Sequence, residues 1–454
     1  MSNRTSEQAI LISSNVTELA LWGGIECTVN RVGDIYQDQV CRSGHHDRAD
    51  DLDCIAELGI ATLRYPVLWE RTAPDHPDEL DWRWSDERLN RLRTLNIQPV
   101  VGLVHHGCGP RYATFDTPAF EEELPRYARR VAERYPWIQA YTPVNEPLTT
   151  ARFAGIYGLW YPHGRSDQLF VQLLLRQVRA TVRAMAEIRV VQPRARLVQT
   201  DDLGYVHSTP GVQYQADFEN TRRWLTWDLL CGRVTPDHDL WNYLRGAGAT
   251  ESELWYHVEN PCPPSVIGVN HYVTSERYLD EDLNRYNTRM HSNNGRQAYV
   301  DTEIVRAAPD RRLGVANLLG QVWERYRIPI VVTEVHLGDR VDEQKRWLGE
   351  VWQQAEQARL AGADVRAVTA WALFGLYDWH CLLTRRENRH EPGVFDVSSG
   401  RPQATGLADM VRHLAGGRPV SALVPPGPGW WQTTDEQHRQ TPPEVGHTGV
   451  LCVQ

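Results

Sequence analysis

The sequence predicts an α/β protein that folds as a single closed (β/α)8 TIM barrel with extended loops at its top face. Short apolar runs alternate with helical patterns eight times along the chain, and this alternation is typical of a parallel sheet. No GxGxxG motif follows any of these runs, which disfavours the alternative of a doubly wound open sheet. A chain of 454 residues is long for one domain, but barrels with long loops reach this size.

The barrel is predicted to occupy residues 18–415. Residues 1–17 are a polar lead-in, and residues 416–454 form a tail rich in proline and glycine. Because such a composition cannot bury a core of its own, the tail is expected to wrap around the barrel or to be loose.

Eight short runs of apolar and β-branched residues are predicted to form the strands. The run at 97–105 is almost uninterrupted, as expected for a parallel strand that is buried on both faces. The run at 138–146 is expected to lead into a loop at Pro147, which has no N–H to donate to a neighbouring strand. In chain order the predicted strands are 18–24, 60–67, 97–105, 138–146, 195–200, 265–271, 328–334 and 365–373.

Helical spacing of apolar residues predicts a helix after most of these strands. The first helix stops at Gly59, Ser85 is expected to cap the second, and Pro193 closes the longest one. The stretch 276–310 is polar, has no period, and is expected to be a long loop at the top face. The predicted helices are 47–58, 85–96, 118–134, 167–191, 217–231, 311–326, 342–360 and 405–414.

Composition excludes several classes of function. The net charge is −10 with both signs interspersed, which argues against nucleic acid or an anionic membrane as partner. No apolar run approaches ~18 residues, no signal segment opens the chain, and eight scattered cysteines lack a CxxC pair, so a reduced, cytoplasmic protein is expected. Lys345 is the single lysine, which disfavours Schiff-base and pyridoxal phosphate chemistry. No cofactor is expected.

Two predicted strands end in a glutamate. Glu146 closes Tyr141-Thr142-Pro143-Val144-Asn145-Glu146, and Glu334 closes Ile330-Val331-Val332-Thr333-Glu334. All strands of a parallel barrel open onto one mouth, so these two carboxyls are expected to face each other across a gap the size of a sugar. Paired carboxyls that flank a bond are the requirement of glycoside hydrolysis. A solvated glutamate at a strand end is the ordinary alternative for either residue alone.

These glutamates belong to an ordered set of motifs, over roughly residues 19 to 415. The order is Trp22-Gly23, Arg64-Tyr65, His105, Thr142-x-x-Asn145-Glu146-Pro147, Asn270-His271-Tyr272, Thr333-Glu334 and Trp371 to Trp379. The set resembles glycoside hydrolase family 1, the β-glucosidase-like enzymes among the retaining barrel glycosidases. The resemblance implies a hydrolase of carbohydrate metabolism that cleaves β-glycosidic bonds in small glycosides by a two-carboxylate double displacement.

The resemblance also implies a role for each residue. Glu146 would be the general acid/base and Glu334 the nucleophile, with their carboxyls about 5–5.5 Å apart. Arg64 would lower the pKa of Glu334, Tyr272 would steer it, and Asn270 opens the same motif. The sugar would be held by Asn145 at its 2-hydroxyl, by His105, by Trp371 as a stacking floor, and at the rim by Asp378, Trp379 and Asn30.

Departures from the family pattern concern the residues that read the sugar. The family glutamine on the first strand is Asn30 here, the rim glutamate is Asp378, and the Trp-Asp pair after the histidine of the third strand is His106-Gly107. The shorter Asp378 and Asn30 predict a glycone other than plain glucose. His106 and Gly107 show no cationic patch for a 6-phosphate.

Three alternatives remain open at this point. The first is a catalytically weak or dead sugar-binding barrel, and the second is a transglycosidase on the same scaffold. The third is a metal-dependent hydrolase that uses His105, His106, His271 and His336. Adjacent strand residues point to opposite faces, and no HExxH motif occurs, so no metal is expected. The oligomeric state is not indicated by the sequence.

Overall fold

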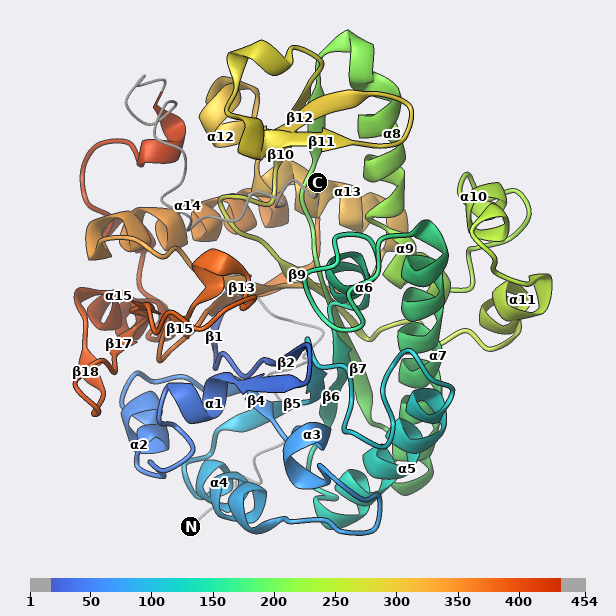
Figure 1. The fold of residues 1–454 in the computed structure, drawn as a ribbon. Helices are drawn as coiled ribbons and strands as arrows, with labels where there is room; N and C mark the ends of the chain where they lie inside the picture. Colours follow the sequence, from blue (N-terminus) through green and yellow to red (C-terminus); the bar gives the residue numbers. More distant parts are fainter. Residues whose placement is uncertain (1–17, 434–454) are drawn as a thin grey trace.

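The computed structural model describes residues 18–433, so the predicted lead-in at 1–17 and the tail from residue 434 onward lie outside the described residues. Eight parallel strands close into a barrel in the order β1-β14-β13-β9-β7-β6-β5-β4, and helices surround it (Figure 1). The predicted fold class is confirmed. The barrel strands are β1 Ala20–Gly24, β4 Thr62–Pro66, β5 Gln98–His105, β6 Ala140–Asn145, β7 Arg196–Asp202, β9 Val266–Asn270, β13 Ile330–Val335 and β14 Val365–Ala370.

The lumen of the barrel is apolar in one layer and polar above it. Seven of the eight strands each contribute one side chain to the apolar layer, as is typical of this fold. Further along the strands, toward their C-terminal ends, the inward positions carry Arg64, Asn145, Asn270 and Glu334, all buried. The apolar layer therefore supports a polar floor at the top of the barrel. The apolar layer consists of Trp22, Val100, Ala140, Val198, Val266, Val331 and Ala367.

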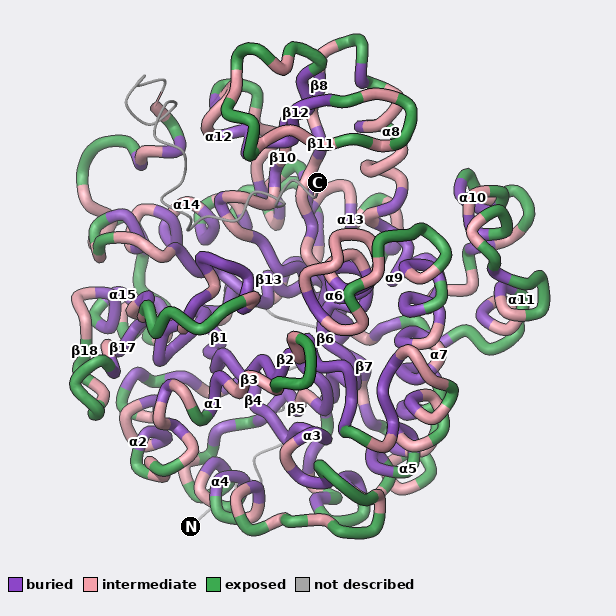
Figure 2. Tube along the Cα trace, in the orientation of Figure 1, coloured by how far each residue is buried: buried purple, intermediate pink, exposed green. Residues whose placement is uncertain are grey.

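Amphipathic helices cover the outside of the barrel, and the strands between them are almost wholly buried (Figure 2). The predicted helix at 167–191 is confirmed to the residue, because Ser166 caps its N-terminus by accepting from the backbone of Leu169. Ser85 is not a cap: the helix begins two residues earlier, after Trp82. The outer helices include α2 Asp51–Ala56, α4 Arg83–Thr94, α5 Ala119–Arg134, α7 Asp167–Val191, α13 Val315–Tyr326, α14 Val341–Leu360 and α15 Gly406–Ala415.

The chain after Glu146 is a helix rather than a loop. Pro147 occupies the first helical position, where its missing N–H costs no hydrogen bond, and α6 runs over Pro147–Gly155. The helix predicted at 217–231 is two helices, α8 Gln213–Arg222 and α9 Leu225–Leu230. Two further helices, α10 Trp241–Gly246 and α11 Glu251–Glu259, were not predicted.

The stretch 276–310 is a small sheet rather than a loop. Its three strands join β8 from an earlier part of the chain in a four-stranded sheet with the order β11-β12-β10-β8, above the barrel in Figure 1. The sheet packs Val206, Leu279 and Tyr299 against Val212 and Ala216 of the neighbouring segment, which gives it a core of its own. Its strands are β8 Val206–Ser208, β10 Arg277–Asp280, β11 His291–Asn293 and β12 Ala298–Glu303, and α12 Ile304–Ala307 follows.

Short elements complete the top and the edge of the barrel. The described part of the tail packs against the barrel, which is the first of the two arrangements expected for it: Trp431 is fully buried and stands edge-on against Trp347 of α14. None of the helices within 18–433 is long and apolar enough to cross a membrane. The predicted cytoplasmic location stays a prediction. The short elements are β2 Val29–Val32, β3 Ile35–Asp38, α1 Gln39–Arg42, α3 Trp69–Thr72, β15 Leu376–Tyr377, β16 His390–Glu391, β17 Phe395–Asp396 and β18 Gln403–Ala404.

Candidate active site

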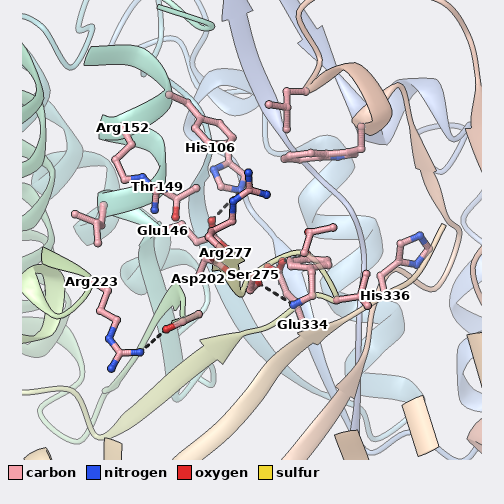
Figure 3. Close-up of a pocket in the computed structure, with 18 of the residues that line it drawn as sticks. His106, Glu146, Thr149, Arg152, Asp202, Arg223, Ser275, Arg277, Glu334 and His336 are labelled. Carbon is pink, nitrogen blue, oxygen red and sulfur yellow. Dashed lines mark hydrogen bonds and ion pairs between the residues drawn. The ribbon is translucent and has the colours of Figure 1, made fainter. Parts of the chain in front are cut away.

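Glu146 and Glu334 line one cavity at the C-terminal mouth of the barrel (Figure 3). Glu334 lies within β13, and Glu146 is the first residue after β6. The backbone of Glu146 is left-handed, with φ 46°, a conformation that a residue with a side chain adopts only where its surroundings hold it. Both side chains are buried. The two predicted strand-end glutamates therefore meet at one site.

Arg64 joins the ends of three strands beneath this cavity. Its Nη1 donates to Oε1 of Glu334 over 2.7 Å, and its Nη2 donates to Oδ1 of Asn145 over 2.7 Å. Thr200 Oγ1 donates to the same Asn145 oxygen over 2.7 Å, which fixes the orientation of this amide. The Tyr272 hydroxyl donates to the second oxygen of Glu334. Glu334 is thus held from two sides by donors.

Glu146 has weaker partners. Asn270 donates from Nδ2 to Oε1 of Glu146, and its own carbonyl accepts from Thr333 Oγ1 over 2.6 Å. The only cation-forming group near the second oxygen of Glu146 within the described chain is His106, whose Nε2 lies 3.7 Å away. Burial and Arg64 lower the pKa of His106 to about 3, so this imidazole is neutral near pH 7. No positive charge therefore offsets the burial of Glu146.

The two glutamates differ in their hold on a proton. Burial raises the pKa of Glu146 well above its usual value, and the nearby charge of Glu334 raises it further. Burial also raises the pKa of Glu334, but Arg64 and Tyr272 act against this effect. The prediction that Arg64 favours the ionised form of Glu334 is right in direction, although burial outweighs it. Of the pair, Glu146 is the group that keeps its proton.

Four further carboxyls line the same cavity, and two of them, Glu26 and Asp202, have raised pKa values. Glu26 lies two residues beyond β1, is 4% exposed, and accepts from the backbone of Thr28 over 2.8 Å. Burial raises its pKa to about 7. Asp202 ends β7, accepts from Ser275 Oγ over 2.5 Å, and has a pKa that burial raises to about 6. Neither residue was assigned a role from the sequence, although Glu26 carries the same signal as Glu146, a carboxyl at a strand end.

The predicted rim carboxylate does not face the cavity. Asp378 is fully buried, and its Oδ2 accepts from Nη2 of Arg42 over 2.6 Å. The backbone N–H groups of residues 387, 388 and 389 donate to the same carboxylate over 2.8–3.1 Å. These contacts occupy the oxygens of Asp378 and hold the loop after β15 in place, so in this geometry the carboxylate is not presented to a sugar; its predicted role stays a prediction.

Other predicted sugar contacts lie behind the cavity wall. The rings of Trp371 and His105 stack on each other at 5.5 Å with an interplanar angle of 11°, and the Arg64 guanidinium lies 4.7 Å from the Trp371 ring centroid. Asn30 is fully buried and donates weakly, over 3.4 Å, to the carbonyl of Leu383. Unlike these residues, Trp379 does line the cavity. An open stacking floor at Trp371 and a hydroxyl contact from Asn30 are thus not found in this geometry.

Four arginines on the cavity wall were also missed. Arg152 lies on α6, which was expected to be a loop, and Arg277 lies on β10, inside the expected loop 276–310. The start of α6 could have been found from Pro147 as a first helical residue. Arg222 and Arg223 are at the end of α8. Across residues 18–433, no group of three or more His, Cys, Asp and Glu side chains is arranged to hold a metal ion.

The chain resembles known glycosidases in both sequence and fold. Residues 20–223 match the family model described as glycosyl hydrolase family 1. A phospho-cellobiase of Klebsiella oxytoca is 23% identical over 403 residues, which cover 80% of this chain and 82% of the relative. A thermostable β-glucosidase B of Thermobispora bispora is 24% identical over 399 residues, covering 79% and 78%. The solved family 1 β-glucosidase of Thermotoga maritima superposes with a TM-score of 0.70 at 16% identity, covering 88% of this chain and 99% of that one.

The barrel, with two buried glutamates at the ends of strands in one cavity, defines a glycosidase. Together with the match over residues 20–223 and the relatives that span four fifths of the chain, it confirms the resemblance seen in the motifs. The chain is therefore similar to glycosyl hydrolase family 1, whose model matches residues 20–223.

Proposed function

We propose that the protein is a retaining β-glycosidase that works by double displacement, with Glu334 as nucleophile and Glu146 as general acid/base. The observation that carries this proposal is the unequal support of the two carboxyls. Arg64 and Tyr272 both donate to Glu334, whereas Glu146 is buried beside a neutral histidine. An ionised nucleophile and a protonated acid are the two states that the first step of a retaining mechanism requires.

In the first step, a carboxylate oxygen of Glu334 attacks the anomeric carbon of the sugar. The bond from this carbon to the leaving oxygen breaks, and Glu146 gives its proton to that oxygen. In the second step, Glu146 takes a proton from a water molecule, whose oxygen displaces Glu334 from the anomeric carbon. As the negative charge of Glu334 is consumed in the glycosyl-enzyme, the pKa of Glu146 falls, because that charge had raised it. This fall suits the change of Glu146 from acid to base.

The supporting residues have matching roles in this proposal. Arg64 orients both Glu334 and Asn145, so it sets the position of the nucleophile relative to the amide that meets the 2-hydroxyl. Tyr272 stabilises the charge on Glu334 between the two steps. Asn270 and Thr333 hold Glu146 at the end of β6.

The glycone is proposed to be a sugar other than plain glucose. This proposal is supported by the contacts of the residues predicted to bind the sugar. Asp378 accepts from Arg42, Asn30 donates to the carbonyl of Leu383, and the rings of Trp371 and His105 stack on each other. Glu26, by contrast, lies in the cavity wall beside the catalytic pair. A different set of polar groups from the one that the family pattern predicts would therefore meet the sugar hydroxyls.

Intact-mass labelling with a panel of 2-deoxy-2-fluoro β-glycosides tests the mechanism and the glycone together. The glycone that fits is expected to add one glycosyl mass to the protein, and peptide mapping should locate it on Glu334. The Glu334→Gln variant should remain unlabelled, while Glu146→Gln should label slowly. Label on another residue, or equal labelling of Glu334→Gln, would remove Glu334 from the nucleophile role. The highest rate with the gluco probe would refute the proposed glycone preference.

A further inference from the structure

One wall of the cavity is rich in arginine side chains that the proposed chemistry does not use. Four arginines line it, from α6, the end of α8, and β10. Figure 3 shows Arg152 beside Thr149 on α6, the helix that follows Glu146, across the pocket from His336. The four are Arg152, Arg222, Arg223 and Arg277.

Arg152 has no ion-pair partner within 4.0 Å in the described part of the chain. Its Nε donates to the hydroxyl of Tyr157 over 3.3 Å, and the acids that act on it, Glu219 and Asp202, do so from a greater distance. Both Nη atoms of its guanidinium therefore keep their donors for another group. A guanidinium presents these donors as a planar fork that matches a carboxylate or a phosphate.

Arg277 is partly satisfied by protein. Its Nε donates to Oδ1 of Asp301 over 2.8 Å, but its Nη1 is buried without a hydrogen-bond partner among residues 18–433. The Asp301 carboxyl is within electrostatic reach of both Arg277 and Arg152, so the two arginines share one corner of the cavity. A buried donor without a partner costs free energy, and an anion that accepts from it would remove that cost.

The other two arginines of this wall have partners in the protein. Arg222 lies 3.6 Å from Glu219, while Arg223 donates to the carbonyl of Gly204 and to Gln321. Glu219 and Asp202 act on Arg152, Asp301 and Glu303 act on Arg277, and Glu276 acts on Arg223. Because these carboxyls at least match the arginines in number, the case for a bound anion rests on the donors of Arg152 and Arg277 that lack a partner among residues 18–433, and not on the net charge of the wall.

The position of this wall decides which part of a substrate meets it. A general acid must lie within hydrogen-bond reach of the leaving-group oxygen, so the leaving group extends past Glu146. Thr149, Arg152 and Phe153 line the same cavity from α6, the helix that follows Glu146 in the chain. We propose that the natural substrate is a glycoside whose leaving group carries an anionic substituent, a carboxylate or a phosphate, held by Arg152 and Arg277. This inference rests on the proposed function, which places Glu146 as the acid.

Binding of free leaving-group analogues tests the inference without any turnover. The probes are 4-hydroxybenzoate, its uncharged amide and phenyl phosphate, titrated by ligand-observed NMR against the wild type, Arg152→Gln and Arg183→Gln. Arg183 is exposed on α7 and supplies the same change of net charge away from the cavity. We expect at least one anion to bind ten-fold or more tightly than the amide, and Arg152→Gln to abolish the preference while Arg183→Gln keeps it. The tighter of the two anions identifies the substituent.

Kinetics on aryl glycosides separate the two proposals. With the glycone that labels Glu334, kcat/KM should be higher for the 4-carboxyphenyl or 4-phosphophenyl glycoside than for the amide analogue. Arg152→Gln should lower kcat/KM for the anionic substrates only. Equal binding of charged and neutral probes would overturn the inference while turnover of the neutral glycoside still supports the proposed function. The inference would also be overturned if Arg152→Gln lowered kcat/KM for a 6-phosphoglycoside with a neutral leaving group and not for the glycosides with an anionic leaving group. If none of the glycosides is turned over, the result counts against the proposed function. The inference is then decided by the NMR titrations alone, that is, by whether the anionic probes bind more tightly than the amide.

Discussion

Glu26 gives the protein a stability that depends on pH in a calculable way. This glutamate is 4% exposed, and burial raises its pKa from the ordinary value of 4.5 to about 7. The folded protein therefore binds the proton of Glu26 more tightly than the unfolded chain does. The stability that belongs to this group is fully present below pH ~4.5 and is lost as the pH rises through 7. The cost at pH 8.5 is about 3 kcal/mol, and at pH 5 it is under about 1 kcal/mol.

Glu26→Gln removes this cost because glutamine stays neutral and its oxygen can still accept from the backbone of Thr28. Urea unfolding followed by tryptophan fluorescence should show the variant to be more stable than the wild type by about 2–3 kcal/mol at pH 8.5. The two proteins should differ by less than about 1 kcal/mol at pH 5. Glu122→Gln, an exposed position on α5, is the control and should change stability little at either pH.

A difference between Glu26→Gln and the wild type that does not change with pH would refute this reasoning. It would mean that Glu26 remains ionised in the folded state, for instance because a counter-charge in the cavity supports it. A variant that is less stable at pH 8.5 would refute it as well, since the carboxylate would then be a net stabilising group.

Three other predictions follow from the same contacts. Glu146→Gln should lower kcat/KM by about 10²–10⁴ on glycosides with poor leaving groups and far less on dinitrophenyl glycosides, which need little protonation; equal losses on both would remove Glu146 from the acid role. The pH profile of kcat/KM should be bell-shaped, since activity is lost as the pH falls through the raised pKa of Glu334 and again as it rises through the higher pKa of Glu146; in Glu146→Gln the alkaline limb should be absent. Asp378→Asn should lower the free energy of unfolding by about 2–4 kcal/mol, because it leaves Arg42 unpaired, with little change in KM; a higher KM at unchanged stability would restore Asp378 as a sugar contact.

The barrel could be predicted from the sequence because its strands are buried on both faces. Runs such as 97–105 and 328–334 remain apolar over their whole length, which makes them visible without any neighbours. The small sheet at 276–310 could not be found in this way. Only a few of its residues, such as Leu279 and Val300, are fully buried, and its strands are short, so no alternation is long enough to detect.

The residues of the candidate site likewise fall into those that the sequence could place and those that it could not. Glu146, Glu334 and Arg64 lie on barrel strands or directly after one, and the pairing of the closed barrel sets their positions. Asp378 occupies the expected place in the order of motifs along the chain, but this order does not determine the direction in which its side chain points. That depends on Arg42, which is 336 residues away in sequence. The arginine wall was missed for a related reason, since Arg277 becomes part of the site only through the sheet that holds β10.

Two departures from the family pattern make close contacts within this chain, and these contacts bear on the choice between an active enzyme and an inert barrel. Asp378 is shorter than the family glutamate and is paired with Arg42. Gly107 replaces a larger residue, and a Cβ at that position would collide with Glu70, whose Oε1 accepts from the backbone of Gly109 over 3.0 Å. Glu334 keeps its donors Arg64 and Tyr272 beneath this rim. Because these contacts serve the carboxylate that the proposed mechanism uses, they favour an active glycosidase over an inert sugar-binding barrel.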